Sequence, residues 1–179
     1  MKASGQIPAT IWFTGLSAAG KSTVAIAVER VLTAQGRPSF ILDGDIVRQG
    51  LCRDLGYSPE DRSENIRRVA EVSRLMNDAG LIVISAFISP LRSDRECARQ
   101  IIGDSRFIEV FMSAPLSVCE WRDPKGMYKR ARAGLLDNFT GVSAPYEAPD
   151  HPALVLNTAS LTVDECVRLV MEQLAAQQC

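Results

Sequence analysis

A glycine-rich segment near the start of the chain, Gly15 to Thr23, sets the strongest limit on the possible fold. Its sequence, GLSAAGKST, fits the pattern G-x-x-x-x-G-K-[ST] of a loop that binds phosphate groups. An apolar run rich in β-branched and aromatic residues precedes it at 10–14, and apolar residues at helical spacing follow it over 24–32. The sequence therefore predicts a buried strand, a phosphate-binding loop and a helix in succession.

The residue types in this loop suit a triphosphate for physical reasons. Gly15 and Gly20 can adopt backbone angles that are closed to residues with a Cβ, so successive N–H groups can turn toward phosphate oxygens. The start of the next helix adds the positive end of its dipole. Lys21 would bring a cation to the β- and γ-phosphates, and the Ser22 hydroxyl would bind the Mg²⁺ between them. The alternative, a turn with a surface lysine, is disfavoured by the flanking strand and helix.

Size and composition limit the classes that remain. A chain of 179 residues with 46% hydrophobic residues suits one α/β domain over residues 1–179. The formal net charge of -1 gives no general indication of nucleic-acid binding. Five cysteines without a C-x-x-C pair, and a single histidine, indicate reduced thiols and disfavour a zinc site. Residues 1–9 hold no apolar leader segment and no run is long enough to span a membrane, so we expect a cytoplasmic protein.

Strand-like and helix-like segments alternate along the chain. We expect a three-layer α/β fold, with a central parallel sheet of about five strands flanked by helices. The continuous apolar run at 81–88 is typical of a central strand covered on both faces, and we place it in the middle of the sheet. The predicted strands are 10–14, 39–42, 81–88, 107–112 and 154–157, and the predicted helices are 24–32, 59–79, 91–102, 115–122 and 162–174.

Two carboxylates, Asp43 and Asp45, follow the second predicted strand directly, with one glycine between them. Ligands bind at the carboxyl ends of strands in open parallel sheets. One carboxylate could hold a metal-bound water and the other could act as a general base. The alternative is an Asx turn that caps the next helix.

An arginine-rich stretch follows over residues 48–68. The planar guanidinium groups of Arg48 and Arg62 suit phosphate or sulfate oxygens, and Tyr57 can stack on a base. Ser58 and Pro59 predict the start of a helix that carries Arg62 and Asn65 in its first turns. The other arginines of this stretch are expected to be solvated surface: Arg53, Arg67 and Arg68.

Ser89 and Pro90 lie between the apolar run and the next predicted helix. Serine followed by proline is typical of a helix start, so a capping role for Ser89 competes with a chemical one. Farther along, residues 122–134 carry five cations with glycines near both ends. We interpret this segment as the start of a mobile lid, approximately 122–150, that closes cations over a triphosphate and excludes water. The alternative for 122–134 is a solvated surface helix.

Taken together, these segments resemble the adenylylsulfate kinase (APS kinase) family over nearly the whole chain. The resemblance implies a P-loop NTPase fold and a Mg²⁺-dependent transfer of phosphate from ATP to the 3′-hydroxyl of adenosine 5′-phosphosulfate (APS). The product would be 3′-phosphoadenosine 5′-phosphosulfate (PAPS), in sulfate assimilation. The matching runs are 15–17 with 20–23, 42–45, 54–62, 64–68, 86–90, 92–95, 122–126, 131–134, 138–141 and 145–149.

The resemblance also implies a role for each matching residue. ATP would be bound by Gly15, Leu16, Ser17, Ala18, Ala19, Gly20, Lys21, Ser22, Thr23, Arg122 and Lys125. Mg²⁺ would be bound by Ser22, with Asp43 supporting its water shell. The substrate would be bound by Asp45, Arg48, Tyr57, Arg62, Asn65, Ile88, Ser89 and Phe139, with Tyr57 and Phe139 on the two faces of its adenine. The catalytic set would be Lys21, Asp45 and Ser89, where Asp45 orients or deprotonates the hydroxyl. In some family members the serine at the Ser89 position is described as a phosphoserine intermediate, which direct in-line transfer does not require.

Some positions depart from the family's pattern. Ile46 stands where the family commonly has asparagine, Gln49 where histidine is frequent, and Asn157 where aspartate is common. Asp137 stands where a cation is usual, and an anion beside a dianionic substrate would weaken its binding unless another cation compensates. Two alternatives therefore stay open, a related kinase for another nucleotide or small alcohol, and a non-catalytic nucleotide-binding module. The resemblance further implies a homodimer and a possible association with ATP sulfurylase.

Overall fold

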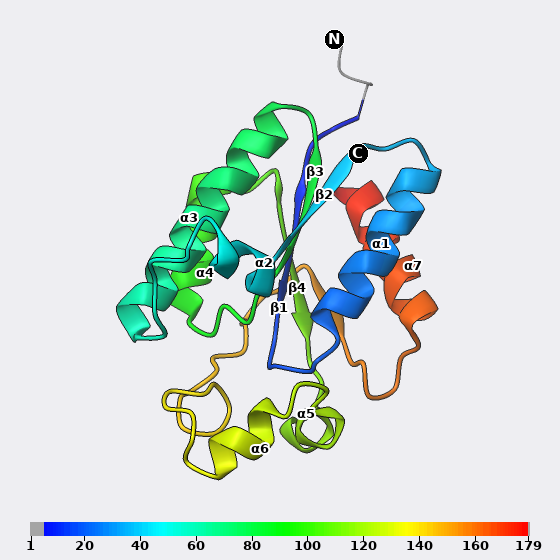
Figure 1. Cartoon of the computed structure of the whole chain (residues 1–179). Helices are drawn as coiled ribbons and strands as arrows, with labels where there is room; N and C mark the ends of the chain where they lie inside the picture. Colours follow the sequence, from blue (N-terminus) through cyan, green and yellow to red (C-terminus); the bar gives the residue numbers. More distant parts are fainter. Residues whose placement is uncertain (1–5, 179) are drawn as a thin grey trace.

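The computed structural model describes residues 6–178, which form a five-stranded parallel sheet between two layers of helices (Figure 1). The strand order is β2-β3-β1-β4-β5, and each neighbouring pair runs parallel. The predicted three-layer fold is confirmed. The strands are β1 (Thr10–Thr14), β2 (Ser39–Asp43), β3 (Ile82–Ala86), β4 (Phe107–Met112) and β5 (Leu154–Leu156).

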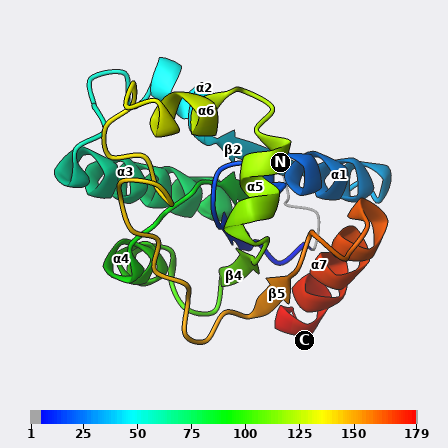
Figure 2. The same cartoon turned by 90° about the horizontal axis from the view of Figure 1, so that it is seen from below.

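The helices divide into two covering layers and a group at one edge of the sheet. Helices α1 and α7 cover one face and α3 and α4 cover the other, while α5 and α6 lie beyond the carboxyl ends of the strands (Figures 1 and 2). This edge is where ligands bind in open parallel sheets. The helices are α1 (Lys21–Ala34), α2 (Gly44–Gln49), α3 (Pro59–Asp78), α4 (Arg92–Ile102), α5 (Leu116–Arg122), α6 (Met127–Arg132) and α7 (Val163–Gln177).

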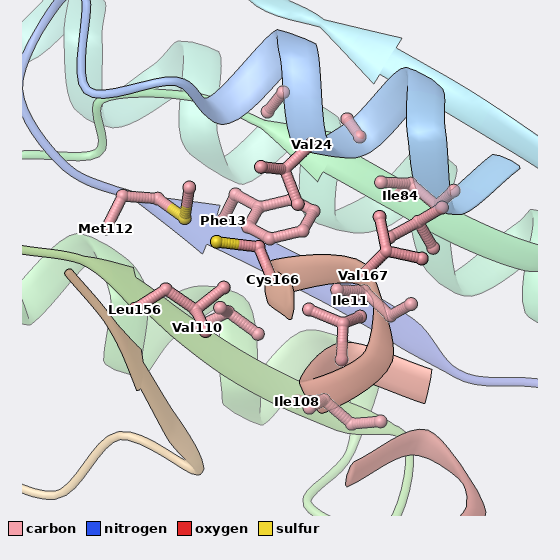
Figure 3. Packing of buried hydrophobic residues seen from close by; sticks show 14 of the residues in the cluster. Ile11, Phe13, Val24, Ile84, Ile108, Val110, Met112, Leu156, Cys166 and Val167 are labelled. Atoms are coloured by element: carbon pink, nitrogen blue, oxygen red, sulfur yellow. The ribbon is translucent and has the colours of Figure 1, made fainter. Parts of the chain in front are cut away.

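The core consists of two apolar clusters, one on each face of the sheet. Alternate residues of a strand point to opposite faces, so β1 contributes to both clusters. Ile11 and Phe13 pack on the α1 and α7 side, close to Val24 and Cys166 (Figure 3), whereas Trp12 packs on the α3 and α4 side. Every residue of β1 is buried, which holds the phosphate-binding loop at the end of a rigid central strand.

The order of the strands differs from the prediction. The middle strand is β1, and the apolar run at 81–88 forms β3, which lies between β2 and β1. A continuous apolar run indicates burial on both faces, and β1 is fully buried in the same way as β3, so the pattern alone could not order them. The short helix α2 is not among the predicted helices and entered only as the alternative in which an Asx turn caps a following helix, because its six residues are too few for a periodic signal.

The predicted start of α3 at Ser58 and Pro59 is confirmed, and α7 begins within one residue of its predicted start. The Ser58 side chain accepts from the Asp61 N–H at the start of α3, and Thr162 forms a capping box with Glu165 at the start of α7. The predicted cap by Ser89 is wrong, because α4 begins three residues later at Arg92. The Arg92 N–H instead donates to the Glu147 carboxylate at 2.8 Å, so a distant residue caps this helix.

Within residues 6–178, no helix combines the length and the apolar character needed to cross a membrane. The expectation of no leader segment falls partly on residues 1–5, which lie outside the described residues, as does Cys179. The four described cysteines are free thiols: Cys52, Cys97, Cys119 and Cys166.

Candidate active site

A cavity of about 1250 Å³ lies at the carboxyl edge of the sheet, between the phosphate-binding loop and α5–α6. This volume is above the range of about 300–1,000 Å³ that is usual for a pocket with one drug-sized ligand. Gly15, Leu16 and Ala19 belong to the loop but do not line the cavity. The other predicted site residues all line it: Ser17, Ala18, Gly20, Lys21, Ser22, Thr23, Asp43, Asp45, Arg48, Tyr57, Arg62, Asn65, Ile88, Ser89, Arg122, Lys125 and Phe139.

The phosphate-binding loop depends on glycine at its first position. Gly15 has φ +148°, and a Cβ built there would lie 2.7 Å from the Met112 carbonyl oxygen. At the other end, Gly20 is the N-cap residue of α1 and has φ +94°, and no side chain caps the helix. The first amides of α1 therefore lack a side-chain acceptor, which is the arrangement that a phosphate can satisfy.

Replacing Gly15 with alanine is expected to lower the free energy of unfolding by about 1–3 kcal/mol, because the new Cβ meets backbone in a region of φ that alanine avoids. Urea unfolding measures this change. Gly44→Ala is the matched control, since Gly44 is the first residue of α2, has no positive φ, and its Cβ would lie 3.5 Å from the Phe87 ring, an ordinary van der Waals contact. The control should stay within about 0.5 kcal/mol of the parent. Equal stability of the two variants would contradict the assignment of close packing at Gly15.

Lys21 lies in the first turn of α1 and is buried. Its ammonium donates to the carbonyl oxygens of Gly15 at 2.9 Å and Leu16 at 2.6 Å, across the loop. Burial lowers the pKa of Lys21 to about 8. A desolvated cation held by two carbonyls of the phosphate-binding loop is placed to bind a polyanion, because a bound phosphate would compensate for the lost hydration.

Ser22 and Asp43 form the part of the site suited to a metal ion. The Ser22 hydroxyl donates to Asp43 Oδ2 at 2.7 Å, and Asp43 Oδ1 accepts from the Asp45 N–H at 3.0 Å. Asp43 therefore does cap α2, as the Asx-turn alternative predicted, and it contacts the loop serine as well. Hydroxyl and carboxylate oxygens suit Mg²⁺. Within residues 6–178, no group of three or more His, Cys, Asp or Glu side chains is placed to hold a metal ion.

The cationic segment 122–134 closes one side of the cavity. Arg122 donates to the Thr158 carbonyl at 2.6 Å and lies 3.4 Å from the Ala18 carbonyl, so it ties α5 to the phosphate-binding loop. Lys125 forms an ion pair with Asp45, and this pair raises the pKa of Lys125. Helix α6 buries Tyr128 and Ala131, so this segment is not simply a solvated surface helix. Its mobility as a lid stays a prediction.

Arginines and an aromatic ring gather at the other end of the cavity. The Arg48 guanidinium lies 4.3 Å from the centre of the Tyr57 ring, and Arg62 lies 5.9 Å from it. Arg62 donates to Thr140 Oγ1 at 2.9 Å and to the Asn138 carbonyl. These contacts hold the segment around Phe139 against α3.

Asn65 and Ser89 complete this end of the cavity. Asn65 is 3% exposed, and its Nδ2 has no hydrogen-bond partner. Buried donors are nearly always satisfied, so this amide indicates a missing polar ligand. Ser89 is buried with φ +40°, and its Oγ accepts from the Trp12 indole N–H at 3.2 Å. Ser89 therefore serves the cavity wall instead of the helix start.

The structure also shows where residues outside the predicted site lie. Ile46 is 68% exposed on α2, and Asp137 is exposed at the cavity wall. Arg67 and Arg68 pair with Glu64 on α3, as expected for surface arginines. The sequence analysis missed Thr158, which holds Arg122, because a lone threonine in a loop carries no signal before its partner is known.

Comparison with known proteins gives consistent results. A family model described as adenylylsulphate kinase matches residues 7–157. An adenylyl-sulfate kinase of Marinobacter nauticus is 59% identical over 162 residues, which cover 90% of this chain and 81% of the relative. One of Aeromonas hydrophila is 59% identical over 159 residues, covering 89% and 81%. The solved structure of the Mycobacterium tuberculosis APS kinase CysC in complex with AMPPNP and APS superposes with a TM-score of 0.92 at 45% identity, covering 95% of this chain and 99% of that chain.

Proposed function

The chain belongs to the adenylylsulphate kinase family, and on that basis we propose that it transfers the γ-phosphoryl group of ATP to the 3′-hydroxyl of APS. The products are ADP and PAPS. The observation that carries the proposal is the single cavity in which a phosphate-binding loop and an arginine-aromatic pocket meet at Asp45. The similar structure with AMPPNP and APS supports this arrangement, because AMPPNP is an analogue of ATP.

ATP binds at the loop end of the cavity in this proposal. The amides at the start of α1 and the Lys21 ammonium hold the β- and γ-phosphates. Ser22 and Asp43 would hold a magnesium ion and its water shell, and such an ion would supply positive charge beside the transferring group. Arg122 and Lys125 approach the phosphates from the opposite side.

APS binds at the arginine end. Arg48 and Arg62 face the phosphosulfate, and the adenine lies between Tyr57 and Phe139. The unpartnered Asn65 amide donates to the nucleotide. Ile88 and Ser89 form the wall of this pocket.

Asp45 orients the 3′-hydroxyl and accepts its proton. A carboxylate can act in this way only when it is not occupied by another cation. We propose that Lys125 leaves Asp45 and binds the phosphates when ATP binds. Asp45 then becomes free to accept the proton of the 3′-hydroxyl at the time when the phosphate donor is in place. Transfer is direct and in line, so Ser89 lines the pocket without forming a phosphoserine.

The pH dependence of nucleotide binding should report Lys21. A pKa lowered to about 8 means that the unliganded protein loses this proton as the pH rises through 8, and a neutral amine does not attract phosphate. AMPPNP affinity should therefore fall above pH 8, with a limiting slope of about tenfold per pH unit, and binding near pH 8 should take up protons. Calorimetry in two buffers of different ionisation enthalpy measures both the AMPPNP affinity and the number of protons taken up on binding. Lys21→Met should remove the dependence, and a wild-type affinity that stays flat from pH 7 to 9.5 would contradict it.

A panel of acceptors tests the function. ADP release should require APS, and PAPS should form in equal amount, as measured by chromatography of the products. Turnover with another nucleotide or a small alcohol, without turnover of APS, would favour a related kinase. ATP binding without any turnover would favour the non-catalytic module.

The finer partner and location assignments remain predictions. We propose one kinase domain over residues 1–179, with a lid at approximately 122–150. The resemblance favours a homodimer, and light scattering of the purified protein would measure it. Association with ATP sulfurylase and a cytoplasmic location are likewise expected, the latter because the cysteines are scattered and unpaired in the sequence.

A further inference from the structure

The wall of the acceptor pocket is held from behind by side chains that do not line the cavity. Ile88 and Ser89 line the cavity, while Thr14, Tyr146 and Arg95 do not. Ser89 adopts φ +40°, a conformation that a serine does not adopt without support. The contacts of its neighbours show what supplies that support.

Thr14 connects the two halves of the site. It is the last residue of β1, directly before Gly15. Its hydroxyl donates to the Ile88 carbonyl at 2.8 Å and lies 2.9 Å from the Tyr146 hydroxyl. A hydroxyl has a single proton, so the Tyr146 O–H is the donor to Thr14. Burial raises the pKa of Tyr146 to about 12, so this phenol keeps its proton.

Arg95 holds the same peptide from a second direction. Its guanidinium donates to the Ser89 carbonyl at 2.6 Å, to the Glu147 carbonyl at 2.6 Å and to Glu109 Oε1 at 2.8 Å. The side chain is 3% exposed. The guanidinium fork thereby joins the strap around residues 145–149 to the pocket wall and to β4.

The strap itself is anchored at both sides of this wall. The Glu147 N–H donates to the Pro90 carbonyl at 2.9 Å, and its carboxylate accepts the Arg92 N–H at the start of α4. The Tyr146 ring stacks on Phe111 with 5.9 Å between ring centres. These contacts tie the strap to the sheet and to α4, so the part of the proposed lid that can move ends before residue 145.

We propose that Tyr146 and Arg95 are positioning residues for the acceptor, which fix the Ile88–Ser89 wall and couple it through Thr14 to the phosphate-binding loop. This inference rests on the proposed function, since it names APS as the ligand of that wall. The Tyr146 hydroxyl acts on this wall through the Thr14 hydroxyl, which also lies 3.3 Å from the Ser89 carbonyl, while the Tyr146 ring lies 5.8 Å from the Arg95 guanidinium. Both residues act on how tightly the acceptor is held, and neither touches it.

Tyr146→Phe tests the inference, because it removes one hydroxyl and keeps the ring on Phe111. We expect KM for APS to rise about five- to tenfold, the strength of one buried hydrogen bond, while KM for ATP stays within twofold. Thr14→Val should raise KM for APS at least as much, and the double variant should be no worse than Thr14→Val alone. Tyr128→Phe is the matched control, since its hydroxyl donates to the Ser17 carbonyl of the phosphate-binding loop and should affect ATP instead.

The outcomes separate the two proposals. Wild-type KM for APS in Tyr146→Phe, or an equal rise for both substrates with a lowered Tm, would overturn the positioning role and leave the proposed function standing. Additive effects of Tyr146→Phe and Thr14→Val would also overturn it. Absence of APS turnover in the wild-type protein would overturn the proposed function, and this inference with it.

Discussion

Replacing Lys21 with alanine is expected to lower kcat about a hundred- to a thousandfold while leaving the fold intact. The buried ammonium is aimed across the phosphate-binding loop, and removal of a single preorganised donor typically costs about 10²–10³ in rate. A coupled assay of ADP release measures the rate, and circular dichroism with thermal unfolding measures the fold.

Lys21→Met separates charge from packing, because methionine keeps most of the methylene chain. It should lose activity to the same extent as Lys21→Ala. Since burial lowers the pKa of Lys21 to about 8, the fold disfavours the charged lysine at neutral pH, so Tm should stay the same or rise. Wild-type turnover in either variant would contradict the role of Lys21, and loss of the folded state would contradict its assignment as a functional residue.

Asp45→Asn is expected to lower kcat by about 10²–10⁴, the usual contribution of a general base, with a smaller effect on APS affinity. Asparagine keeps the shape of the side chain but cannot accept the proton of the 3′-hydroxyl. The ion pair with Lys125 would also be lost, which frees that lysine for the phosphates. Steady-state kinetics with APS and ATP varied separately measures these effects.

Asp137→Asn is the matched control for this change. Asp137 is exposed at the wall of the same cavity. Removing its negative charge should keep kcat and lower KM for APS, because a dianionic substrate no longer faces an anion. Equal losses of kcat in the two variants would mean that net charge, and not proton transfer at Asp45, controls the rate.

Local features of the fold could be predicted because they depend on residues that are close together in the sequence. Strand, loop and α1 follow from a motif whose residues lie side by side in the chain, and the cap at Ser58 follows from residues three apart. The order of the strands could not be predicted in this way. The interior strands are all nearly fully buried and mostly apolar, and pairing between strands that are distant in the chain places β1 in the centre.

In the site, too, some features could be predicted from the sequence and others could not. Most residues that were predicted for the site do line the cavity. They could be named although they are far apart in the chain, because the resemblance to a known family identifies them together. The sequence left a helix cap open as an alternative role for Ser89, since the serine-proline pattern cannot reveal that Trp12 and Arg95 hold this residue from other elements. The support by Tyr146 was missed for the same reason, because 132 positions separate it from Thr14.

A structure of this protein with Mg²⁺, AMPPNP and APS tests the central claim most directly. We expect the Asp45 carboxylate within about 2.6–3.2 Å of the acceptor 3′-hydroxyl, and the Lys21 ammonium on the donor phosphates. Arg48 and Arg62 should face the phosphosulfate. A complex in which Asp45 is far from every sugar hydroxyl, or in which both arginines point away from the sulfate, would contradict the account.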